Sequence, residues 1–391
     1  MVYDFILFEN AYSVENHYKD LGILAILLKK AGYKVAIANV FKENELCIPE
    51  GIPHIDFKKQ APSFFRTSSD KSLANNPLKT LFIRIVEDRY ISYVLKECAK
   101  ISNNIYLGSL TLGVPTFFLS QLNKHITYYF WGLRSITPIR WKTSRMGYYS
   151  LISKRLYKAI TKNNNVRIIV SNEIIRDEFA ENVGVPLERL VLRPERIISN
   201  LPIIVPSAKG KLNILSIGTL RPFKRIELCL NALRILSNPK INYTIAGRCR
   251  DGSGYDKLIE QKMLGLSNVK RIDRYISEEE YEELMNGCDC LVICDEPQES
   301  CPSNGTMLEA LLHGKPIIAP DFDPFKYEID KYGIGVIYKE GDVDSLCRAI
   351  YFLLEEGTES FKKNLYKYGK AHLIDTVASK IKDQIGNDKS N

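Results

Sequence analysis

Two short segments in the C-terminal half combine residue types that bind phosphate and sugar. The first, SIGTLRPFKR (216–225), passes from an apolar run through Gly218 to three cations, Arg221, Lys224 and Arg225. Arginine can grip a phosphate with two parallel hydrogen bonds, and lysine supplies a compact positive charge. A helix that begins after such a turn attracts anions through its unpaired N–H groups and its dipole. The segment therefore predicts a diphosphate site, although a solvated basic turn would have the same composition.

The second segment, PSNGTMLEALLHGKPIIAP (302–320), contains a loop of small residues that leads into a helix. We expect the N–H groups and hydroxyls of this loop to face a diphosphate or a sugar, through Ser303, Asn304, Gly305 and Thr306. Gly305 allows a close approach of the backbone. Glu309 lies one turn into the helix, where its carboxylate could accept both hydroxyls of a ribose. The alternative is an ordinary helix cap followed by a solvated glutamate.

Strands and helices alternate around both segments. Apolar runs predict strands at 212–218, 241–247, 288–294, 316–320 and 335–338, and the stretch NVKRID (268–273) lies between two of the expected helices. Helices are expected near 226–236, 255–264, 277–286, 305–312 and 342–355. Continuous apolar strands that alternate with helices indicate a parallel sheet covered on both faces. In such a doubly wound domain, the ligand binds at the carboxyl ends of the strands.

The N-terminal half shows the same α/β alternation. Strands are expected at 3–9, 33–40, 104–109, 125–130 and 166–171, with helices at 17–31 and 84–99. The sequence therefore predicts an acceptor-binding domain at 1–198, a linker at 199–211 and a nucleotide-sugar-binding domain at 212–370. A final helix within 371–391 is expected to pack back toward the N-terminal domain.

Residues 165–357 resemble the donor-binding domain of the GT-B glycosyltransferases, specifically the large retaining family numbered four. The resemblance implies two Rossmann-like domains facing across a cleft, a nucleoside-diphosphate sugar as donor, retention of the anomeric configuration and no metal or other cofactor. Lys224, six residues after Gly218, falls at the position of the family's diphosphate-binding lysine. The family's arginine position is Thr219 here, and Arg221 is expected to replace it.

The resemblance also implies a pair of glutamates separated by seven residues. The second binds the ribose and matches Glu309, whereas the first, which contacts the donor sugar, is Cys301 here. Glu299 or Glu296 could supply the missing carboxylate. A further match, RYISEEEYEELMNGCDCLV (274–292), places Tyr275 or Ile276 against the base.

The N-terminal half offers fewer candidates. Glu9 and Asn10 follow the first strand and could meet an acceptor hydroxyl, or could form an ordinary loop into the helix. The family often has a histidine after a central strand of this domain. Arg134 is the nearest polar residue in that region, and His125 precedes the strand and is expected to be structural.

Charge is distributed unevenly along the 391 residues. The net charge is +8, and residues 121–170 contain ten Lys or Arg with no Asp or Glu. Within this segment, residues 140–163 form an amphipathic pattern whose basic face could lie on anionic lipid, or could simply face solvent. No nucleic-acid-binding module accompanies the charge, so no nucleic-acid partner is expected.

The nine cysteines do not form paired metal-binding knuckles. Four of them, Cys288, Cys290, Cys294 and Cys301, lie close in sequence, and a buried strand explains CDCLVIC (288–294) better than a metal site does. The chain start lacks a basic region and a long apolar run, and no apolar stretch reaches the ~18 residues of a spanning helix. We therefore expect a cytoplasmic protein that can also sit peripherally on the inner face of the membrane.

The leading hypothesis is a glycosyltransferase that moves a hexose from a nucleoside-diphosphate sugar to a glycan or glycolipid in surface polysaccharide or lipopolysaccharide synthesis. Two alternatives remain open. One is a sugar-nucleotide epimerase of the same fold, and the other is a non-catalytic protein that binds a sugar nucleotide or a partner transferase.

Overall fold

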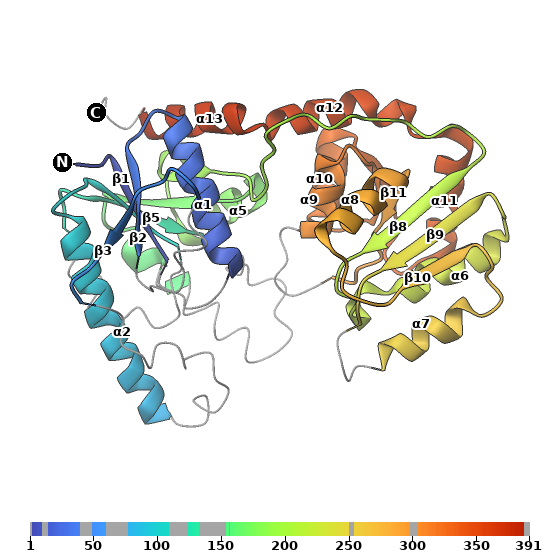
Figure 1. The fold of residues 1–391 in the computed structure, drawn as a ribbon, viewed down its shortest axis with the longest axis horizontal. Coiled ribbons are helices and arrows are strands. Elements are labelled where there is room, and N and C mark those ends of the chain that lie inside the picture. The colour runs from blue at the N-terminus through green and yellow to red at the C-terminus, as the bar shows by residue number, and fades with distance from the viewer. Residues whose placement is uncertain are drawn as a thin grey trace. The chain divides into compact units, whose positions relative to one another are not determined.

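The computed structural model describes residues 2–9, 15–39, 49–59, 77–108, 123–132, 154–155, 157–249, 254–297 and 304–386. The chain divides into two compact units (Figure 1). The first comprises residues 1–195 together with 374–391, and the second comprises residues 196–373. Among the described residues, no helix is both long and apolar enough to cross a membrane.

The first unit contains a parallel sheet of seven strands within the described residues, in the spatial order β3-β2-β1-β4-β5-β6-β7. The strands are β1 Phe5–Phe8, β2 Val35–Asn39, β3 His54–Asp56, β4 Asn104–Leu107, β5 Thr127–Trp131, β6 Val166–Val170 and β7 Leu190–Leu192. Every neighbouring pair is parallel. The interior strand β1 is buried along its whole length, as expected for a strand covered on both faces.

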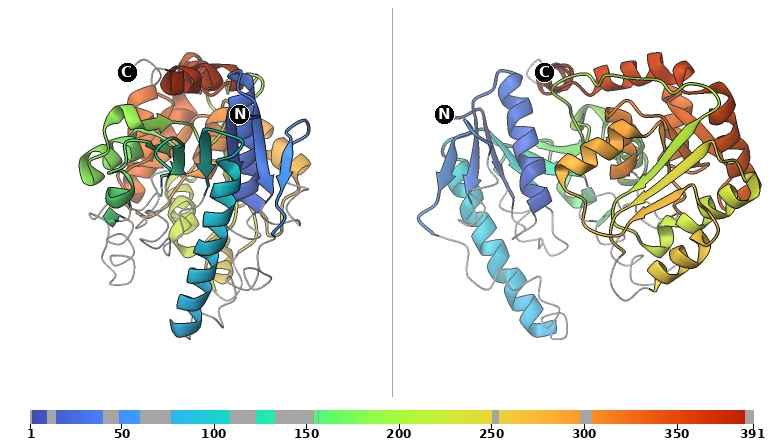
Figure 2. Two further views of the ribbon diagram at one scale, coloured as in Figure 1. Left: turned by 90° about the vertical axis from the view of Figure 1, so that its left-hand side faces the viewer. Right: turned by 45° about the vertical axis from the view of Figure 1, so that its right-hand side comes forward.

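The helices of this unit are α1 Glu15–Lys30, α2 Pro77–Cys98, α5 Glu173–Glu178 and α13 Ile374–Gly386. Helix α13, at the end of the chain, lies beside α1 (Figures 1 and 2). Its buried residues recur at helical spacing: Val377, Ala378, Ile381 and Ile385. Its polar Gln384 accepts a hydrogen bond from the Leu192 N–H at 2.7 Å, which ties α13 to β7.

The second unit contains a parallel sheet of six strands within the described residues, in the order β10-β9-β8-β11-β12-β13. The strands are β8 Leu212–Ile217, β9 Ile241–Ala246, β10 Val269–Ile272, β11 Cys290–Val292, β12 Ile317–Pro320 and β13 Gly335–Tyr338. The strand order reverses between β8 and β11, and doubly wound sheets bind ligands at such a switch point. The apolar core of the unit contains Cys288, Cys290 and Cys294, which are buried free thiols.

The helices of the second unit are α6 Ile226–Leu236, α7 Tyr255–Met263, α8 Glu278–Gly287, α9 Gly305–Leu312, α10 Phe325–Tyr332, α11 Val343–Glu356 and α12 Lys362–Ala371. Their ends follow the expected capping chemistry. Asp342 caps α11 by accepting the Ser345 N–H at 2.9 Å. Gly314 follows α9 with a φ of +71°, a left-handed conformation that favours glycine.

Ser277 and Glu280 at the start of α8 have the spacing of a capping box, which forms only in part. Ser277 accepts the Glu280 N–H at 3.3 Å. The Glu280 carboxylate, however, accepts a hydrogen bond from Arg274 Nη2 at 2.8 Å, and no return bond to the Ser277 N–H is seen. The guanidinium is the stronger partner because both groups are charged.

The fold class predicted from the sequence is confirmed, because both units are doubly wound parallel α/β domains. Two short strands were missed. β3 and β7 have three residues each, and β3 is largely exposed, so neither produces a long apolar run.

The segment between the units lies along the second one. The Ile198 N–H donates to the His372 carbonyl at 3.0 Å, and the Gly210 N–H donates to the Leu354 carbonyl at 2.7 Å. The Ser207 N–H donates to Thr358 Oγ1 at 2.7 Å. Most of residues 199–211, which the sequence suggested as a linker, therefore follow the surface of the second unit.

Candidate functional site

The carboxyl ends of β8 and β9 approach each other closely in the second unit. Gly218 and Gly247 follow these strands with φ values of +118° and +131°. A Cβ on Gly247 would lie 2.0 Å from the Gly218 carbonyl oxygen, so a side chain cannot be accommodated there. A Cβ on Gly218 would instead face Thr306 Oγ1 at 3.7 Å. The backbone turn after β8 thus faces the first turn of α9.

A pocket lies where these elements meet, at the switch point between β8 and β11. Its lining comes from the ends of both strands, the turn after β8 and the start of α9: Ser216, Ile217, Thr219, Leu220, Lys224, Ile226, Val292, Ile293, Cys294, Asp295 and Thr306. Of the residues predicted from the sequence, Lys224 and Thr306 line this pocket.

Lys224 is held by a carboxylate that the sequence reasoning overlooked. Its Nζ lies 2.8 Å from Asp295 Oδ2, and the same oxygen accepts Asn304 Nδ2 at 3.0 Å. Burial raises the pKa of Asp295, and the neighbouring Lys224 opposes that rise. The sequence does contain a signal for Asp295, because this acidic residue directly follows the apolar run CDCLVIC, at the carboxyl end of an expected strand.

Asn304 has two roles in the structure. Its Oδ1 accepts the Met307 N–H at 3.0 Å, which makes it the N-cap of α9, while its amide nitrogen contacts Asp295. The first N–H groups of a helix have no partner within the helix, and the Thr306 side chain in this first turn lies opposite Gly218. Lys224 and a helix N-terminus therefore lie at one small pocket, an arrangement that favours a bound anion.

The other two predicted cations differ from Lys224. Arg221 is exposed. Arg225 has a left-handed backbone with φ of 45°, and its guanidinium pairs with Glu340 in the loop after β13. Neither arginine lines the pocket described above.

Glu309 lies on α9 and pairs with Arg196, at 2.9 Å between Nε and Oε1. The side chain of Glu309 is 32% exposed, so its carboxylate can be reached from solvent. The two base candidates, Tyr275 and Ile276, follow β10. Tyr275 is 83% exposed, whereas Ile276 packs partly against the core of the unit.

Polar groups also gather at the carboxyl ends of strands in the first unit. Glu9, directly after β1, is buried, and a Cβ on Gly108 would lie 2.2 Å from its Oε2. Glycine at 108 therefore makes room for the carboxylate. Burial raises the pKa of Tyr106, with Glu9 adding to the rise and Arg193 opposing it, which indicates that the three groups are neighbours.

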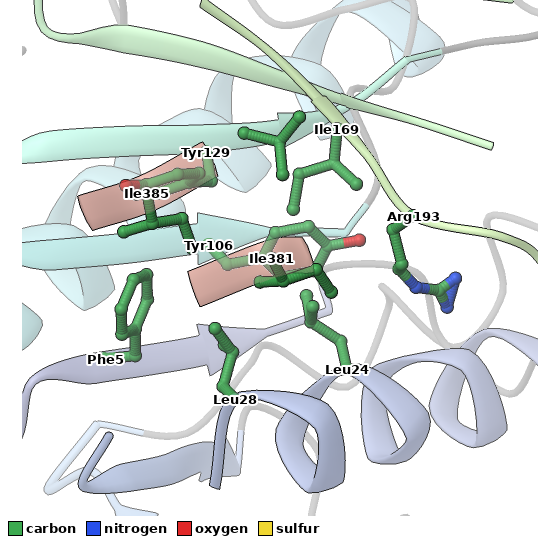
Figure 3. A pocket seen from close by; sticks show the side chains of 10 residues that line it. Phe5, Leu24, Leu28, Tyr106, Tyr129, Ile169, Arg193, Ile381 and Ile385 are labelled. Atoms are coloured by element: carbon green, nitrogen blue, oxygen red, sulfur yellow. The ribbon is translucent and has the colours of Figure 1, made fainter. Parts of the chain in front are cut away.

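Arg193 was not predicted from the sequence. Its guanidinium lies 4.8 Å from the centre of the Trp131 ring and donates to the Asp20 carbonyl at 3.3 Å. Figure 3 shows Arg193 at the edge of a small apolar cavity, with its charged end directed away from the apolar side chains. Its Nε and Nη1 are buried and have no hydrogen-bond partner in the described part of the chain.

Several predicted residues lie outside the described residues: Asn10, Arg134, Glu299, Cys301 and Ser303. Residues 121–122, 133–153 and 156 of the basic segment 121–170 are also outside them. Of its amphipathic part, Tyr157 and Ile160 are buried in the core of the first unit, while Arg155, Lys158 and Lys162 are exposed.

Residues 200–372 match the family described as Glycosyl transferases group 1. This match spans nearly all of the second unit, residues 196–373. A relative from Xanthomonas campestris pv. campestris, described as GDP-mannose:glycolipid 4-beta-D-mannosyltransferase, is 24% identical over 133 residues. That match covers 34% of this chain and 37% of the relative, so the chain spans little more than a third of that relative's length.

Solved structures resemble the whole chain. HepE of Anabaena, solved in complex with UDP, is 15% identical with a TM-score of 0.66, covering 98% of this chain and 100% of that one. Sucrose-phosphate synthase of Thermosynechococcus elongatus is 15% identical with a TM-score of 0.63, covering 99% and 98%. At these identities the likeness shows the fold, which is GT-B. The prediction of a glycosyltransferase with this fold is confirmed at the level of domain family and fold.

Proposed function

We propose that the chain transfers a hexose from a nucleoside-diphosphate sugar to a glycan or glycolipid acceptor. The observation that carries the proposal is the pocket at the strand switch point, where Lys224 and the N-terminus of α9 meet. Displacement of a nucleoside diphosphate leaves negative charge on the departing phosphate. A lysine and a helix N-terminus aimed at that charge stabilise the transition state.

The comparisons support the same substrate classes. The Xanthomonas relative is named for a GDP-mannose donor and a glycolipid acceptor. HepE has been solved with UDP-glucose. A third neighbour in structure is a lipopolysaccharide outer core galactosyltransferase, with a TM-score of 0.61 and 11% identity. We infer that the acceptor belongs to surface polysaccharide or lipopolysaccharide synthesis at the inner face of the membrane.

The reaction is proposed to retain the anomeric configuration and to need no metal. In this scheme Lys224 and the α9 N-terminus take the role that a divalent cation plays for the diphosphate in metal-dependent transferases. Arg221 is assigned to the same diphosphate, and Glu309 to the ribose. Proton NMR of the product, with and without a chelator in the assay, tests both points.

A thermal-shift screen against UDP, GDP, dTDP, CMP and their sugar conjugates tests the donor site. A ligand at 100 times its dissociation constant stabilises the folded state by about 2.7 kcal/mol. We expect a shift with one nucleotide family that is lost in Lys224→Ala. If no nucleotide shifts the wild-type chain, the transferase proposal fails.

Product analysis separates the alternatives. Conversion of the donor without an acceptor would indicate an epimerase. Tight donor binding with no transfer to any acceptor would indicate a non-catalytic binding protein.

A further inference from the structure

Arg196 fixes one oxygen of the carboxylate that the proposed function assigns to the ribose. Its Nε donates to Glu309 Oε1 at 2.9 Å. The side chains of Arg196 and Glu309 are 43% and 32% exposed. Ion pairs that are this exposed to solvent contribute little to stability. The main consequence of the pair is therefore the placement of the Glu309 carboxylate.

The backbone around Arg196 is anchored to the same unit as Glu309. Two residues further on, the Ile198 N–H donates to the His372 carbonyl at 3.0 Å. Gly369 on α12 has no side chain, and Leu201 and Ile198 pack into the space, within 3.3 Å and 3.7 Å of where its Cβ would be. Because α12 packs on α9, the segment that carries Arg196 and the helix that carries Glu309 are held together.

The second oxygen of Glu309 is available to a ligand. Glu309 Oε2 has no hydrogen-bond partner in the part of the chain that the structure describes. Tyr281 of α8 is close, because Glu309 adds to the burial that raises the pKa of Tyr281 and Arg196 opposes it. The Glu309 carboxylate thus lies beside a cation, fixed at one oxygen and open at the other.

We propose that Arg196 positions Glu309 to accept the 2′- and 3′-hydroxyls of a ribose, so that the chain selects ribonucleotide over 2′-deoxyribonucleotide donors. The inference rests on the proposed function, because it requires a nucleotide in this site. A 2′-deoxyribose lacks one of the two hydroxyl donors, and its loss leaves a carboxylate lone pair unmatched. We expect wild type to prefer the ribonucleotide by about tenfold, which corresponds to about 1.4 kcal/mol.

Isothermal titration calorimetry of the full chain with UDP, 2′-deoxy-UDP, GDP and 2′-deoxy-GDP measures this preference. In Arg196→Gln we expect the preference to fall to about twofold, with the deoxynucleotide affinity within twofold of wild type. Arg196→Lys keeps the charge and should recover part of the preference. Lys209→Gln breaks another exposed ion pair of the same segment, with Glu356 at 2.9 Å, and should leave the preference unchanged.

The outcomes that overturn the inference are distinct. An Arg196→Gln variant that keeps the tenfold preference, or that loses affinity for both nucleotides equally, shows that Arg196 does not position Glu309. If wild type binds the ribonucleotide and the 2′-deoxyribonucleotide with equal affinity, Glu309 does not bind the ribose hydroxyls, and the proposed diphosphate site is unaffected. Failure of wild type to bind any nucleoside diphosphate removes the proposed function itself.

Discussion

The contact between Lys224 and Asp295 determines the electrostatics of the candidate site. Asp295 holds Lys224 at 2.8 Å and Asn304 at 3.0 Å through the same oxygen. Only about 8% of the Asp295 side chain is exposed. A buried carboxylate that bridges two groups fixes the lysine where a phosphate can reach it, but its charge must be compensated.

Asp295→Asn should change how stability depends on pH. Burial raises the pKa of Asp295 above its usual 3.8 in the folded chain. A carboxyl whose pKa is higher in the folded state than in the unfolded state stabilises the fold at pH values below its unfolded-state pKa. This stabilisation is lost as the pH rises through the folded-state pKa. Wild type should therefore lose stability relative to Asp295→Asn as the pH rises from about 4. Thermal unfolding of both proteins across a pH series measures the difference in stability. An increase in the stability of wild type relative to Asp295→Asn with rising pH would contradict the burial argument.

Individual site residues were predictable where a motif fixed their position. Lys224 and Thr306 were placed by their spacing from Gly218 and from the helix at 305–312, and both line the pocket. Asp295, Arg196 and Arg193 were not predicted. Their positions depend on which strand ends and segments come together in space, and no spacing along the chain records that. The roles of all these residues remain predictions.

At the scale of elements, the two glycines after β8 and β9 determine how closely the strand ends pack. Gly247→Ala would place a Cβ 2.0 Å from the Gly218 carbonyl oxygen, at a φ of +131°. We expect a loss of about 2–4 kcal/mol in unfolding free energy, from overpacking and backbone strain, together with weaker nucleotide binding. Gly287→Ala is the matched control, because its Cβ would meet nothing within 4 Å. Chemical denaturation of both variants tests this, and similar stability of the two would show that the strand ends have room to move apart.

The longer elements were predictable because burial leaves a periodic pattern. Apolar runs identified five strands of the second sheet, and the capping Asp342 located the start of α11. The remaining strand, β10, lies in the mixed stretch 268–273, which has no continuous apolar run. The three-residue strands β3 and β7 escaped because so short a strand leaves no pattern, and their pairing with neighbours defines them. The beginning of α2, at Pro77, also lay earlier than the expected residue 84.

At the scale of the molecule, the basic surface of the first unit predicts an association with anionic lipid. Arg155, Lys158 and Lys162 are exposed, while Tyr157 and Ile160 of the same stretch are buried in the core. Each basic residue near an anionic surface contributes about 1 kcal/mol at moderate salt. Sedimentation with vesicles should show binding to anionic but not to zwitterionic lipid, weakened by salt and by the triple change to Gln. Equal sedimentation with both lipids, or with neither, would contradict this role.

Transfer of labelled sugar is the measurement that tests the central claim most directly. The nucleotide family found in the thermal-shift screen identifies the donors to use, and glycolipid and oligosaccharide acceptors are offered in turn. We predict transfer by wild type and a loss of at least about a hundredfold in Lys224→Ala, since removal of one group that stabilises developing charge typically costs that much. Near-normal transfer by Lys224→Ala, with the fold intact, would contradict the assignment of the pocket at β8 and β11 as the donor site.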